Sequence, residues 1–518
     1  MPAPAPPVEA APGLQPAGGR TDRSTVLAAA AVAVFGLLVT MTGSWVPSAW
    51  ADEGATMSGV RRSLPELWRM VHHVDGVHGA YYLLLHLWFE VVPYSPFTLR
   101  LPSAIAVGLA AGLTVLLVQR LAGPWTAVVA GVLTCCVPRL LFAGTEGRSS
   151  ATSTLAAVGL TLVLVVALDR TRERRRTAVA WWVGYTVIAV LAGLLFVYTD
   201  LVVLAHAVTI GLLVLGRHRR AEARAALWWA GAALVAGLVL LPFVRMVSGQ
   251  TGQLYWMGAF RLDAALAQRV FVGQWFGGTG PWAVVPWALV VAGVVATLVV
   301  PRLRGRVPAL AVALPVVVVP TVVVVVVSLL VRPLYDPRYL TFCSPFVAVL
   351  VALALTSVPW RVVTIVALVA LAALVTPIWV AQRTPTAKDG STWAAAAQVL
   401  TDGRAAEPPG TRDAIWYGPL PRHPNRTTEF VAAAYPDAFA GMRDLSLRRS
   451  AVSLGQLWAE RSDVRDPLPS TDDVDRIWFV GQRTDDEPRL LQRQLRAAGW
   501  TVTQRWFTGK FVILKADR

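Results

Sequence analysis

The sequence predicts an α-helical, multi-pass membrane protein that ends in a small α/β domain, and three observations lead to this fold class. Of the 518 residues, 55% are hydrophobic and only 15% are charged, whereas soluble globular chains average about 45–50% apolar and about 25% charged residues. The mean hydropathy is +0.54, and apolar runs long enough to cross a bilayer recur along the chain. From Gln382 onward the composition changes abruptly to that of a soluble domain.

The charge pattern argues against a nucleic-acid partner. The formal net charge is +16, but the basic residues fall in short clusters between apolar runs and do not form one face of a soluble domain. The cysteines Cys135, Cys136 and Cys343 lie inside apolar runs without the spacing of metal ligands. We expect them to be small, buried, apolar side chains.

The N-terminal residues 1–22 are rich in proline, alanine and glycine, so we expect a disordered cytosolic tail. The apolar run that follows covers residues 26–45. This run is longer than the roughly 7–15 apolar residues of a signal peptide. It therefore predicts a retained membrane anchor at the start of a transmembrane domain that extends over residues 23–381.

About eleven apolar runs reach the roughly 20 residues that a helix needs to cross the hydrocarbon layer of a bilayer. They cover residues 24–44, 100–119, 124–143, 150–168, 179–198, 200–216, 226–244, 281–300, 308–331, 339–358 and 361–380. Pro320 lies inside one of these runs and predicts a kink there, which membrane helices tolerate.

Dense arginine clusters set the orientation, because positively charged loops stay in the cytoplasm. These clusters are residues 170–176, 217–224 and 302–306. The protein is then a multi-pass protein of the plasma membrane with a cytoplasmic N-terminus. The loop 45–99 and the C-terminal domain are predicted to lie outside the cell.

The external loop 45–99 contains two segments that we expect to be interfacial helices. Segment 78–92 is apolar, but it is short. Counting it as a span would put the arginine clusters on the outer side of the membrane, or else place the N-terminus outside. We interpret it as an interfacial or re-entrant helix. The stretch "SLPE" (63–66) has the spacing of a capping box. The helix it starts is amphipathic and would lie on the membrane surface or pack against the outer domain.

Residues 382–518 show the alternation of a small extracytoplasmic α/β domain. We expect helices at 391–401 and 487–499, strands at 413–418 and 476–482, and paired strands within 500–516. The domain has neither a phosphate-binding glycine loop nor a metal-binding cluster in its sequence. Substrate docking and simple stabilisation both remain open as its role.

Ionisable residues gather on the predicted outer side, where residues near membrane depth are candidates for function. They are Asp52, Glu53, His72, His73, Asp75, His78, Arg100, Glu146, Arg148, Asp200, Arg245, Arg332, Asp336 and Arg338. Carboxylates can abstract a proton from a hydroxyl group, and arginine side chains match the oxygens of a phosphate. No nucleotide fingerprint is present, so a lipid-linked donor is the simplest source of a phosphate outside the cell. The carboxylates could instead solvate a helix end, and the arginines could extend toward the membrane surface.

Four sequence pieces, in this order, resemble integral-membrane glycosyltransferases of the GT-C fold. The first is the Asp-Glu pair in "ADEGAT" (51–56), and the second is "HGAYYLLLHLWFEVV" (78–92), similar to a His-Pro-Pro-x-Tyr-Tyr segment. The third is "FTLRLPSAIAVGLAAGLTVLLVQRLAG" (97–123), and the fourth is "GTEGRSSATSTLAAVGL" (144–160), similar to a Glu-Ala-Arg-x-Tyr-Ala stretch. The superfamily includes the protein O-mannosyltransferases and the lipid A aminoarabinose transferase. The prolines of the second motif and the aromatic residue of the fourth are absent here.

The resemblance implies an inverting glycosyltransferase that moves a sugar, most simply mannose, from a polyprenyl-phosphate donor to an acceptor hydroxyl on a glycan, lipoglycan or protein. Asp52 would be the general base, and Glu53 would orient the acceptor or Asp52. By the same resemblance, Asp75 and His78 shape the site. The lipid phosphate would be held by Arg148, Arg338 and Arg100. The arginine-rich composition looks like that of an actinobacterial member, which suggests a decaprenyl-phosphate donor and a cell-envelope acceptor.

Some members of this fold use a divalent metal and others do not, so a cofactor requirement stays open and no residue is assigned as a metal ligand. Two other classes of protein also stay open. A transporter of lipid-linked glycans would carry charges deep in several spans and show paired broken helices, whereas the charges here gather on one side. A non-catalytic membrane scaffold for cell-envelope assembly would retain its fold and lack activity.

Overall fold

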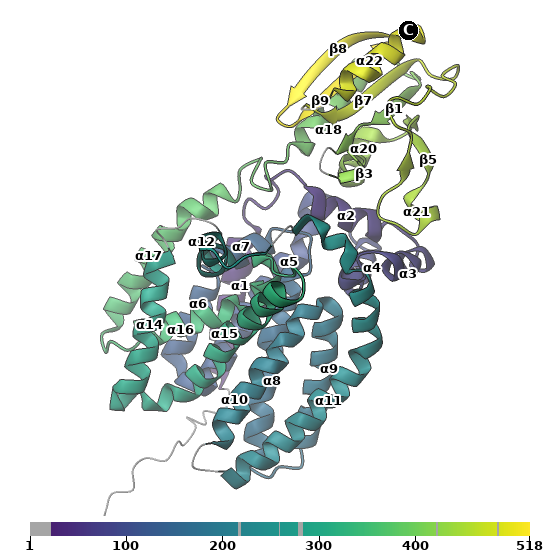
Figure 1. Cartoon of the computed structure of the whole chain (residues 1–518). Coiled ribbons are helices and arrows are strands. Elements are labelled where there is room, and N and C mark those ends of the chain that lie inside the picture. The colour runs from purple at the N-terminus through teal and green to yellow at the C-terminus, as the bar shows by residue number, and fades with distance from the viewer. Residues whose placement is uncertain (1–21, 216–218, 258–259, 278–282, 421–422, 484–485) are drawn as a thin grey trace, which may run out of the picture.

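The computed structural model describes residues 22–215, 219–257, 260–277, 283–420, 423–483 and 486–518. The expected N-terminal tail therefore lies almost entirely outside the described residues. A helical bundle makes up most of the chain, and the C-terminal sheet domain sits at one end of it (Figure 1). The first loop, residues 42–95, lies between the bundle and this domain.

The described residues contain nine helices long and apolar enough to cross a membrane, or ten if one bent pair counts as a span. They are α1 (Arg23–Met41), α5 (Pro96–Ala122), α8 (Ser150–Arg172), α9 (Ala178–Leu195), η2 with α10 (Val197–Asp200, Leu201–Val214), α11 (Arg219–Gly249), η6 with α15 (Pro301–Arg306, Val307–Leu330), η7 with α16 (Pro337–Cys343, Ser344–Leu355) and α17 (Arg361–Ala381). The chain is thus a multi-pass membrane protein, as the composition predicted.

The expected count of about eleven spans is not confirmed. The apolar run 124–143 forms two helices, α6 (Pro124–Thr134) and α7 (Pro138–Gly144), with a bend of 61° between them. Pro138 begins the second helix, where its missing N–H costs nothing. The run 281–300 is described as α14 (Val284–Val299), which has 16 residues and is about 24 Å long, shorter than the hydrocarbon layer. α15 is one continuous helix that contains both Pro315 and Pro320.

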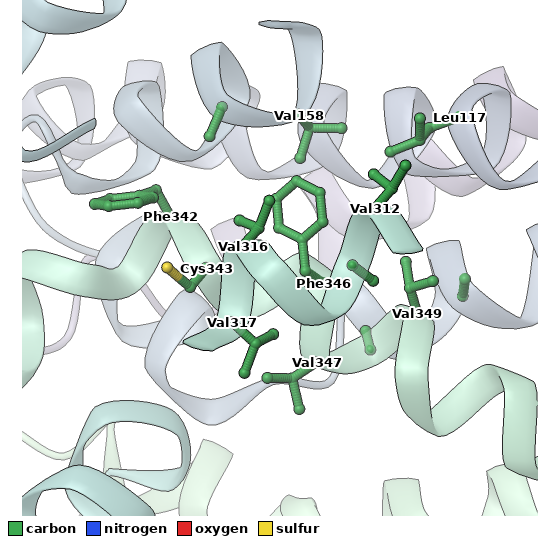
Figure 2. Packing of buried hydrophobic residues seen from close by; sticks show 14 of the residues in the cluster. Leu117, Val158, Val312, Val316, Val317, Phe342, Cys343, Phe346, Val347 and Val349 are labelled. Atoms are coloured by element: carbon green, nitrogen blue, oxygen red, sulfur yellow. The ribbon is translucent and has the colours of Figure 1, made fainter. Parts of the chain in front are cut away.

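The bundle core is packed from branched and aromatic side chains of non-consecutive helices. Figure 2 shows Val158 of α8 near Val316 of α15 and Phe346 of α16, all of them buried. Close backbone approach supports this packing between α1 and α5, where a Cβ atom on Gly108 would lie 2.5 Å from the carbonyl oxygen of Ala33. Cys135 and Cys343 are buried as expected, whereas Cys136 is only half-buried.

The first loop folds into α2 (Ala51–Val60), α3 (Leu64–His73), η1 (Gly76–His78) and α4 (Gly79–Phe89). α4 has 11 residues, too few to span a bilayer, in agreement with its interpretation as an interfacial or re-entrant helix. The capping box at the start of α3 is confirmed, since the backbone N–H of Ser63 donates to the Glu66 carboxylate at 3.0 Å. α3 packs Leu67 into the protein and leaves Trp68 exposed, so one side packs inward while the other presents an aromatic ring.

The C-terminal part has the predicted α/β architecture. Its sheet has the strand order β4-β1-β7-β9-β8, with β1 parallel to β4 and β7 and the remaining neighbours antiparallel. The strands of this sheet are β1 (Asp413–Tyr417), β4 (Arg443–Asp444), β7 (Arg476–Gln482), β8 (Thr501–Thr508) and β9 (Phe511–Asp517). The helices α18 (Trp393–Ala405) and α22 (Glu487–Ala497) match the expected ones to within a few residues.

Shorter elements complete the chain. They are η3 (Thr251–Met257), α12 (Ala264–Gln268), η4 (Arg269–Gly273) and α13 (Gln274–Phe276) after α11, and β2 (Pro419–Leu420), β3 (His423–Thr427), α19 (Phe430–Ala434), α20 (Pro436–Phe439), β5 (Leu447–Arg449), α21 (Ala451–Leu454) and β6 (Glu460–Arg461) in the C-terminal part.

The first loop and the C-terminal domain share one hydrophobic core. Phe430 of α19 and Trp393 of α18 belong to the same buried cluster as Met57 of α2 and Tyr82 of α4. The contact is close at Gly54, where a Cβ atom would lie 2.7 Å from Phe430 Cβ and 2.9 Å from Trp393 Cζ3. This packing fixes α2 between the membrane helices and the sheet domain.

Gly54→Ala should therefore lower the melting temperature of the detergent-solubilised protein, because overpacking a tight contact costs about 1–3 kcal/mol. The matched control is Gly237→Ala on α11, where a Cβ atom meets nothing within 4 Å and the change should be neutral or slightly stabilising. Equal melting temperatures for the two variants would contradict the tight docking of α2.

Candidate active site

A cavity of about 1110 Å³ lies where the first loop, the membrane helices and the C-terminal domain meet. Charged and aromatic side chains from all three parts line it, among them Trp50, Asp52, Asp75, His78, Glu146, Arg148, Phe196, Tyr198, Arg338, Tyr339, Arg426 and Trp458. Apolar residues of α11 and α15 line it as well, including Val244, Val247, Val323, Val324 and Val327. The cavity thus combines a polar part with an apolar wall made by two membrane helices.

Asp52 stands at the centre of the charged side chains. It lies in the first turn of α2, where the helix dipole favours a negative charge. Its Oδ2 atom accepts a hydrogen bond of 2.9 Å from Arg338 Nη1, and its Oδ1 atom lies 3.7 Å from Arg148 Nη2. Asp336 accepts a 3.1 Å hydrogen bond from Arg338 Nε and so orients the same guanidinium.

The two arginines determine the charge state of Asp52. Burial on its own would raise the pKa of this carboxyl group, but the positive charges of Arg148 and Arg338 outweigh burial and hold the pKa below its ordinary value. Asp52 is therefore ionised and well paired in the unliganded protein. A ligand anion that attracted the arginines would remove this pairing.

Asp75 positions Arg148 through Tyr82. Arg148 Nη1 donates a 2.8 Å hydrogen bond to the Tyr82 hydroxyl, which in turn donates to the Asp75 carboxylate. The Asp75 carboxylate also lies 3.6 Å from Arg148 Nη1. Asp75 has a φ of 57°, a left-handed conformation that aspartate tolerates better than most residues. Asp75 is thus a support of the arginine as well as part of the cavity wall.

His78 forms the aromatic side of the cavity. Its ring stacks on Phe196 with centroids 5.5 Å apart, and Phe196 stacks in turn on Tyr198 at 5.1 Å. His78 Nδ1 lies 3.1 Å from the Ser149 hydroxyl. Burial, followed by the charge of Arg148, lowers the pKa of the imidazole to about 4. His78 is neutral near pH 7.

Glu53 and Arg100 do not line the cavity, in contrast to the expectation from the sequence. Both side chains are fully buried and form two hydrogen bonds of 2.8 and 2.7 Å with each other. Glu53 also accepts from the Gly147 N–H at 3.1 Å and lies 3.6 Å from Lys388 Nζ. Arg100 donates to the carbonyl oxygen of Ser44 at 2.6 Å. The pair joins four segments of the chain and is structural. The N–H groups of the Arg100 guanidinium are engaged by Glu53 and by backbone carbonyl oxygens, so they are not available to a phosphate.

Five of the seven assigned site residues thus meet in the cavity: Asp52, Asp75, His78, Arg148 and Arg338. Among the described residues, no group of three or more histidine, cysteine or acidic side chains is arranged to hold a metal ion. His72 and His73 sit on α3, and their Nδ1 atoms lie 2.8 Å from the carbonyl oxygens of Trp68 and Arg69.

Sequence reasoning missed several residues of the site. Tyr82 stands in the second motif, so its place beside Asp75 could have been inferred from that motif. Lys388, one of only three lysines in the chain, follows the last membrane helix and is buried against Glu53. Nothing in the local sequence pattern distinguishes Tyr198, Tyr339 or Trp458 from other aromatic residues.

The same fold occurs in solved structures. ArnT from Cupriavidus metallidurans, a lipid A aminoarabinose transferase, matches in its apo state with a TM-score of 0.58 and 13% sequence identity, over 95% of this chain and 98% of that chain. The same protein bound to undecaprenyl phosphate matches with a TM-score of 0.52 and 14% identity, over 96% and 98% of the two chains. The chain therefore has the GT-C fold, which confirms the fold that the four motifs indicated. No protein-family model and no curated protein matches the sequence.

Glu53→Gln should destabilise the protein strongly, because breaking a buried ion pair leaves an uncompensated charge and costs about 3–5 kcal/mol. The matched variant is Asp52→Asn at the neighbouring position. It should fold normally, since Arg338 keeps Asp336 and Arg148 keeps Asp75 as partners. Thermal unfolding in detergent measures both effects, and a larger loss in Asp52→Asn would contradict the assignment of roles.

His78 should make the folded state sensitive to acid. The unfolded chain binds a proton on this imidazole near its ordinary pKa of about 6.5, whereas the folded protein binds it only near about 4. Stability from this group is therefore complete above about pH 6.5 and is lost as the pH falls toward 4. The drop in melting temperature between pH 7.5 and pH 5 should be smaller in His78→Gln than in the wild type. An identical drop would show that His78 does not contribute.

Proposed function

We propose that this protein is a glycosyltransferase that moves a sugar from a polyprenyl-phosphate donor to an acceptor hydroxyl group on the outer side of the cell membrane. The observation that carries the proposal is the pairing of Asp52 with two arginines inside a cavity that also has an apolar wall. A proton acceptor and a phosphate-binding group are the two elements this reaction requires. The solved structure of ArnT bound to undecaprenyl phosphate shares the fold and supports the class of donor.

The cavity suits a ligand with a charged head and an apolar tail. The valines of α11 and α15 on its wall belong to helices that also expose apolar side chains such as Leu238 and Val326 on the outside of the bundle. A polyprenyl chain can therefore lie against this wall, with its phosphate near Arg148 and Arg338. Guanidinium groups bind phosphate oxygens through paired, charge-assisted hydrogen bonds.

In the reaction, the acceptor oxygen attacks the anomeric carbon of the sugar while the polyprenyl phosphate leaves from the opposite face, so that the configuration inverts. Asp52 accepts the proton of the acceptor hydroxyl, by the same logic as the base of an inverting glycosidase. General base catalysis contributes about 10²–10⁴-fold to the rate. The arginines stabilise the charge on the departing phosphate, and this electrostatic contribution adds to that of the base.

Because Asp52 is paired with two arginines in the unliganded site, its strength as a base depends on whether the donor is bound. When a donor phosphate attracts Arg338 and Arg148, the positive charge around Asp52 is shared with the phosphate, and the pKa of the carboxyl group rises toward its ordinary value. Asp52 then becomes a stronger base. The donor itself would bring about the change, which favours transfer only when both substrates are present.

The acceptor would enter from the side of the C-terminal domain, where Trp458, Gln456 and Arg426 line the same cavity. We assign residues 23–381 to the catalytic membrane domain and 382–518 to an outer domain that forms this wall. The arginine clusters support an orientation with the N-terminus in the cytoplasm, because positively charged loops stay on that side. Mannose as the sugar and a cell-envelope glycan, lipoglycan or protein as the acceptor complete the proposal.

Asp52→Asn should abolish transfer while leaving the protein folded. Membranes that contain the wild type or the variant are incubated with radiolabelled decaprenyl-phospho-mannose, and the label is followed into lipid, glycan and protein fractions. We expect a loss of at least about 100-fold, the lower end of general base catalysis. The decaprenyl-phospho-arabinofuranose donor tests the sugar.

Asp389→Asn is the matched control, because Asp389 lines the cavity and its one ion pair among the described residues is with Lys510, at 3.8 Å. Asparagine also tolerates the left-handed φ of 50° at this position. This control should retain transfer. Equal transfer by Asp52→Asn and the wild type would refute Asp52 as the base, and no transfer of either sugar by the wild type would contradict the proposed donors.

A further inference from the structure

The turn that carries Asp75 gives up regular backbone hydrogen bonds. α3 ends at His73, and Asp75 then takes a left-handed φ of 57°. If the helix continued, the N–H of Asp75 would donate to the carbonyl oxygen of Val71, because each N–H of an α-helix donates to the fourth residue before it. Backbone groups released at a helix end need other partners wherever water cannot reach them.

Two glutamine side chains from the end of α11 and from η3 supply these partners. Gln250 Nε2 donates to the carbonyl oxygen of Val71 at 2.8 Å, and Gln250 Oε1 accepts from the N–H of Gly76 at 2.8 Å. Gln253 Oε1 accepts from the N–H of Asp75 at 3.3 Å. One short turn of backbone is therefore held by two side chains that lie 174 to 179 positions further along the chain.

The turn also fits closely against the end of α11. Gly76 is buried, and a Cβ atom on it would lie 3.0 Å from Met246 Cε and 3.1 Å from Gln250 Nε2. Met246 belongs to the last turn of α11. The position of the turn, and with it the position of Asp75, is therefore set by the end of this helix and by the glutamine that follows it.

From this turn, polar contacts lead to an arginine that the proposed function assigns to the donor phosphate. The Asp75 carboxylate accepts from the Tyr82 hydroxyl, which accepts a 2.8 Å hydrogen bond from Arg148 Nη1. The same carboxylate lies 3.6 Å from Arg148 Nη1, and Arg148 Nη2 lies 3.7 Å from Asp52 Oδ1. A guanidinium group binds phosphate through paired hydrogen bonds of fixed geometry. A displaced Asp75 would therefore misdirect Arg148.

The glutamines follow directly on the apolar wall proposed for the polyprenyl chain. Val244 and Val247 of α11 line the cavity, and so do Gln250 and Gln253. The backbone N–H of Gln250 donates to the carbonyl oxygen of Val247 at 3.0 Å, so the glutamine continues the last turn of the helix. The segment that would lie beside the lipid chain is thus the one that holds the turn of Asp75.

We propose that Gln250 and Gln253 are positioning residues that hold Arg148 in the orientation that binds the donor phosphate, acting through Asp75 and Tyr82. The inference rests on the proposed function, because it presupposes a polyprenyl-phosphate donor. The glutamines then matter for the phosphate and not for the polyprenyl chain, although they lie next to the wall for that chain. Two lipids with the same chain, one with and one without a phosphate, separate these contributions.

The test measures equilibrium binding of decaprenyl phosphate and of the neutral alcohol decaprenol to the full-length protein in nanodiscs by native mass spectrometry. The wild type should bind decaprenyl phosphate more tightly than decaprenol. Gln250→Met keeps a side chain of similar size but cannot make the two hydrogen bonds to the turn. It should lower the affinity for decaprenyl phosphate about tenfold, the effect of one hydrogen bond to a charged group, and leave the affinity for decaprenol unchanged.

Gln398→Met on α18 is the matched control, because the exposed Gln398 amide donates to Asp402 of the same helix at 2.7 Å. This variant should bind both lipids like the wild type. A purely structural role of Gln250 would lower the affinity for both lipids alike. An equal loss for both lipids in Gln250→Met, or no loss for either, would therefore overturn the inference.

A double-mutant cycle shows whether Gln250 acts through Tyr82 or touches the lipid itself. Tyr82→Phe removes the hydroxyl group that joins Asp75 to Arg148. In this background Gln250→Met should cost less affinity for decaprenyl phosphate than it does in the wild type, because residues that act through one hydrogen-bond network are not additive. A loss as large as in the wild type would mean a direct contact with the lipid and would refute the positioning role.

Gln253→Met decides the matter if Gln250→Met fails to fold, because it removes the acceptor for the N–H of Asp75. It should show the same selective loss to a smaller extent, and an unchanged preference for decaprenyl phosphate would overturn the inference. Failure of the wild type to distinguish decaprenyl phosphate from decaprenol would instead refute the phosphate site of the proposed function. The two failures are therefore distinguishable.

Discussion

The buried ion pair between Glu53 and Arg100 is the interaction on which the candidate site depends. Successive residues of an α-helix point about 100° apart, so burying Glu53 beneath α2 turns Asp52 toward the cavity. Through Glu53 the pair also holds Gly147, in the segment that carries Glu146 and Arg148. Lys388, which follows the last membrane helix, approaches the same carboxylate. A single buried charge thus sets the positions of three parts of the site.

Such a pair is expensive to bury, and its partners explain why it is tolerated. Taking a carboxylate and a guanidinium out of water costs more than their attraction returns unless hydrogen bonds satisfy the remaining polar atoms. Here Arg100 donates to both Glu53 oxygens and to the carbonyl oxygens of Ser44 and Pro47. The first loop is therefore tied to α5 by polar contacts as well as by its hydrophobic core.

The charged side chains that line the cavity, unlike the buried pair, can exchange partners. Asp52, Asp75 and Asp336 neutralise Arg148 and Arg338, but each arginine touches two carboxylates. Binding an anion can therefore exchange one partner without leaving an arginine unpaired. The buried pair beneath provides rigidity, and the paired arginines above provide charges that a ligand can redirect. Electrostatic preorganisation of this kind is effective in catalysis because the dipoles and charges are in place before the reaction.

The sequence by itself determined the membrane class, the positions of most spans and the α/β domain, because run length and composition are local properties. Its motifs also predicted Asp52, Arg148 and Arg338 as site candidates, and the fold brings all three to one cavity. Composition and spacing could not show that Glu53 is buried in an ion pair while Asp52 lines the cavity, since adjacent carboxylates have the same chemistry and only their surroundings differ. The bend between α6 and α7, the shortness of α14, and the burial of Arg100 likewise depend on packing against distant segments. Tertiary structure alone brought Lys388 to Glu53, because contacts between residues more than two hundred positions apart leave no periodic signal in the chain.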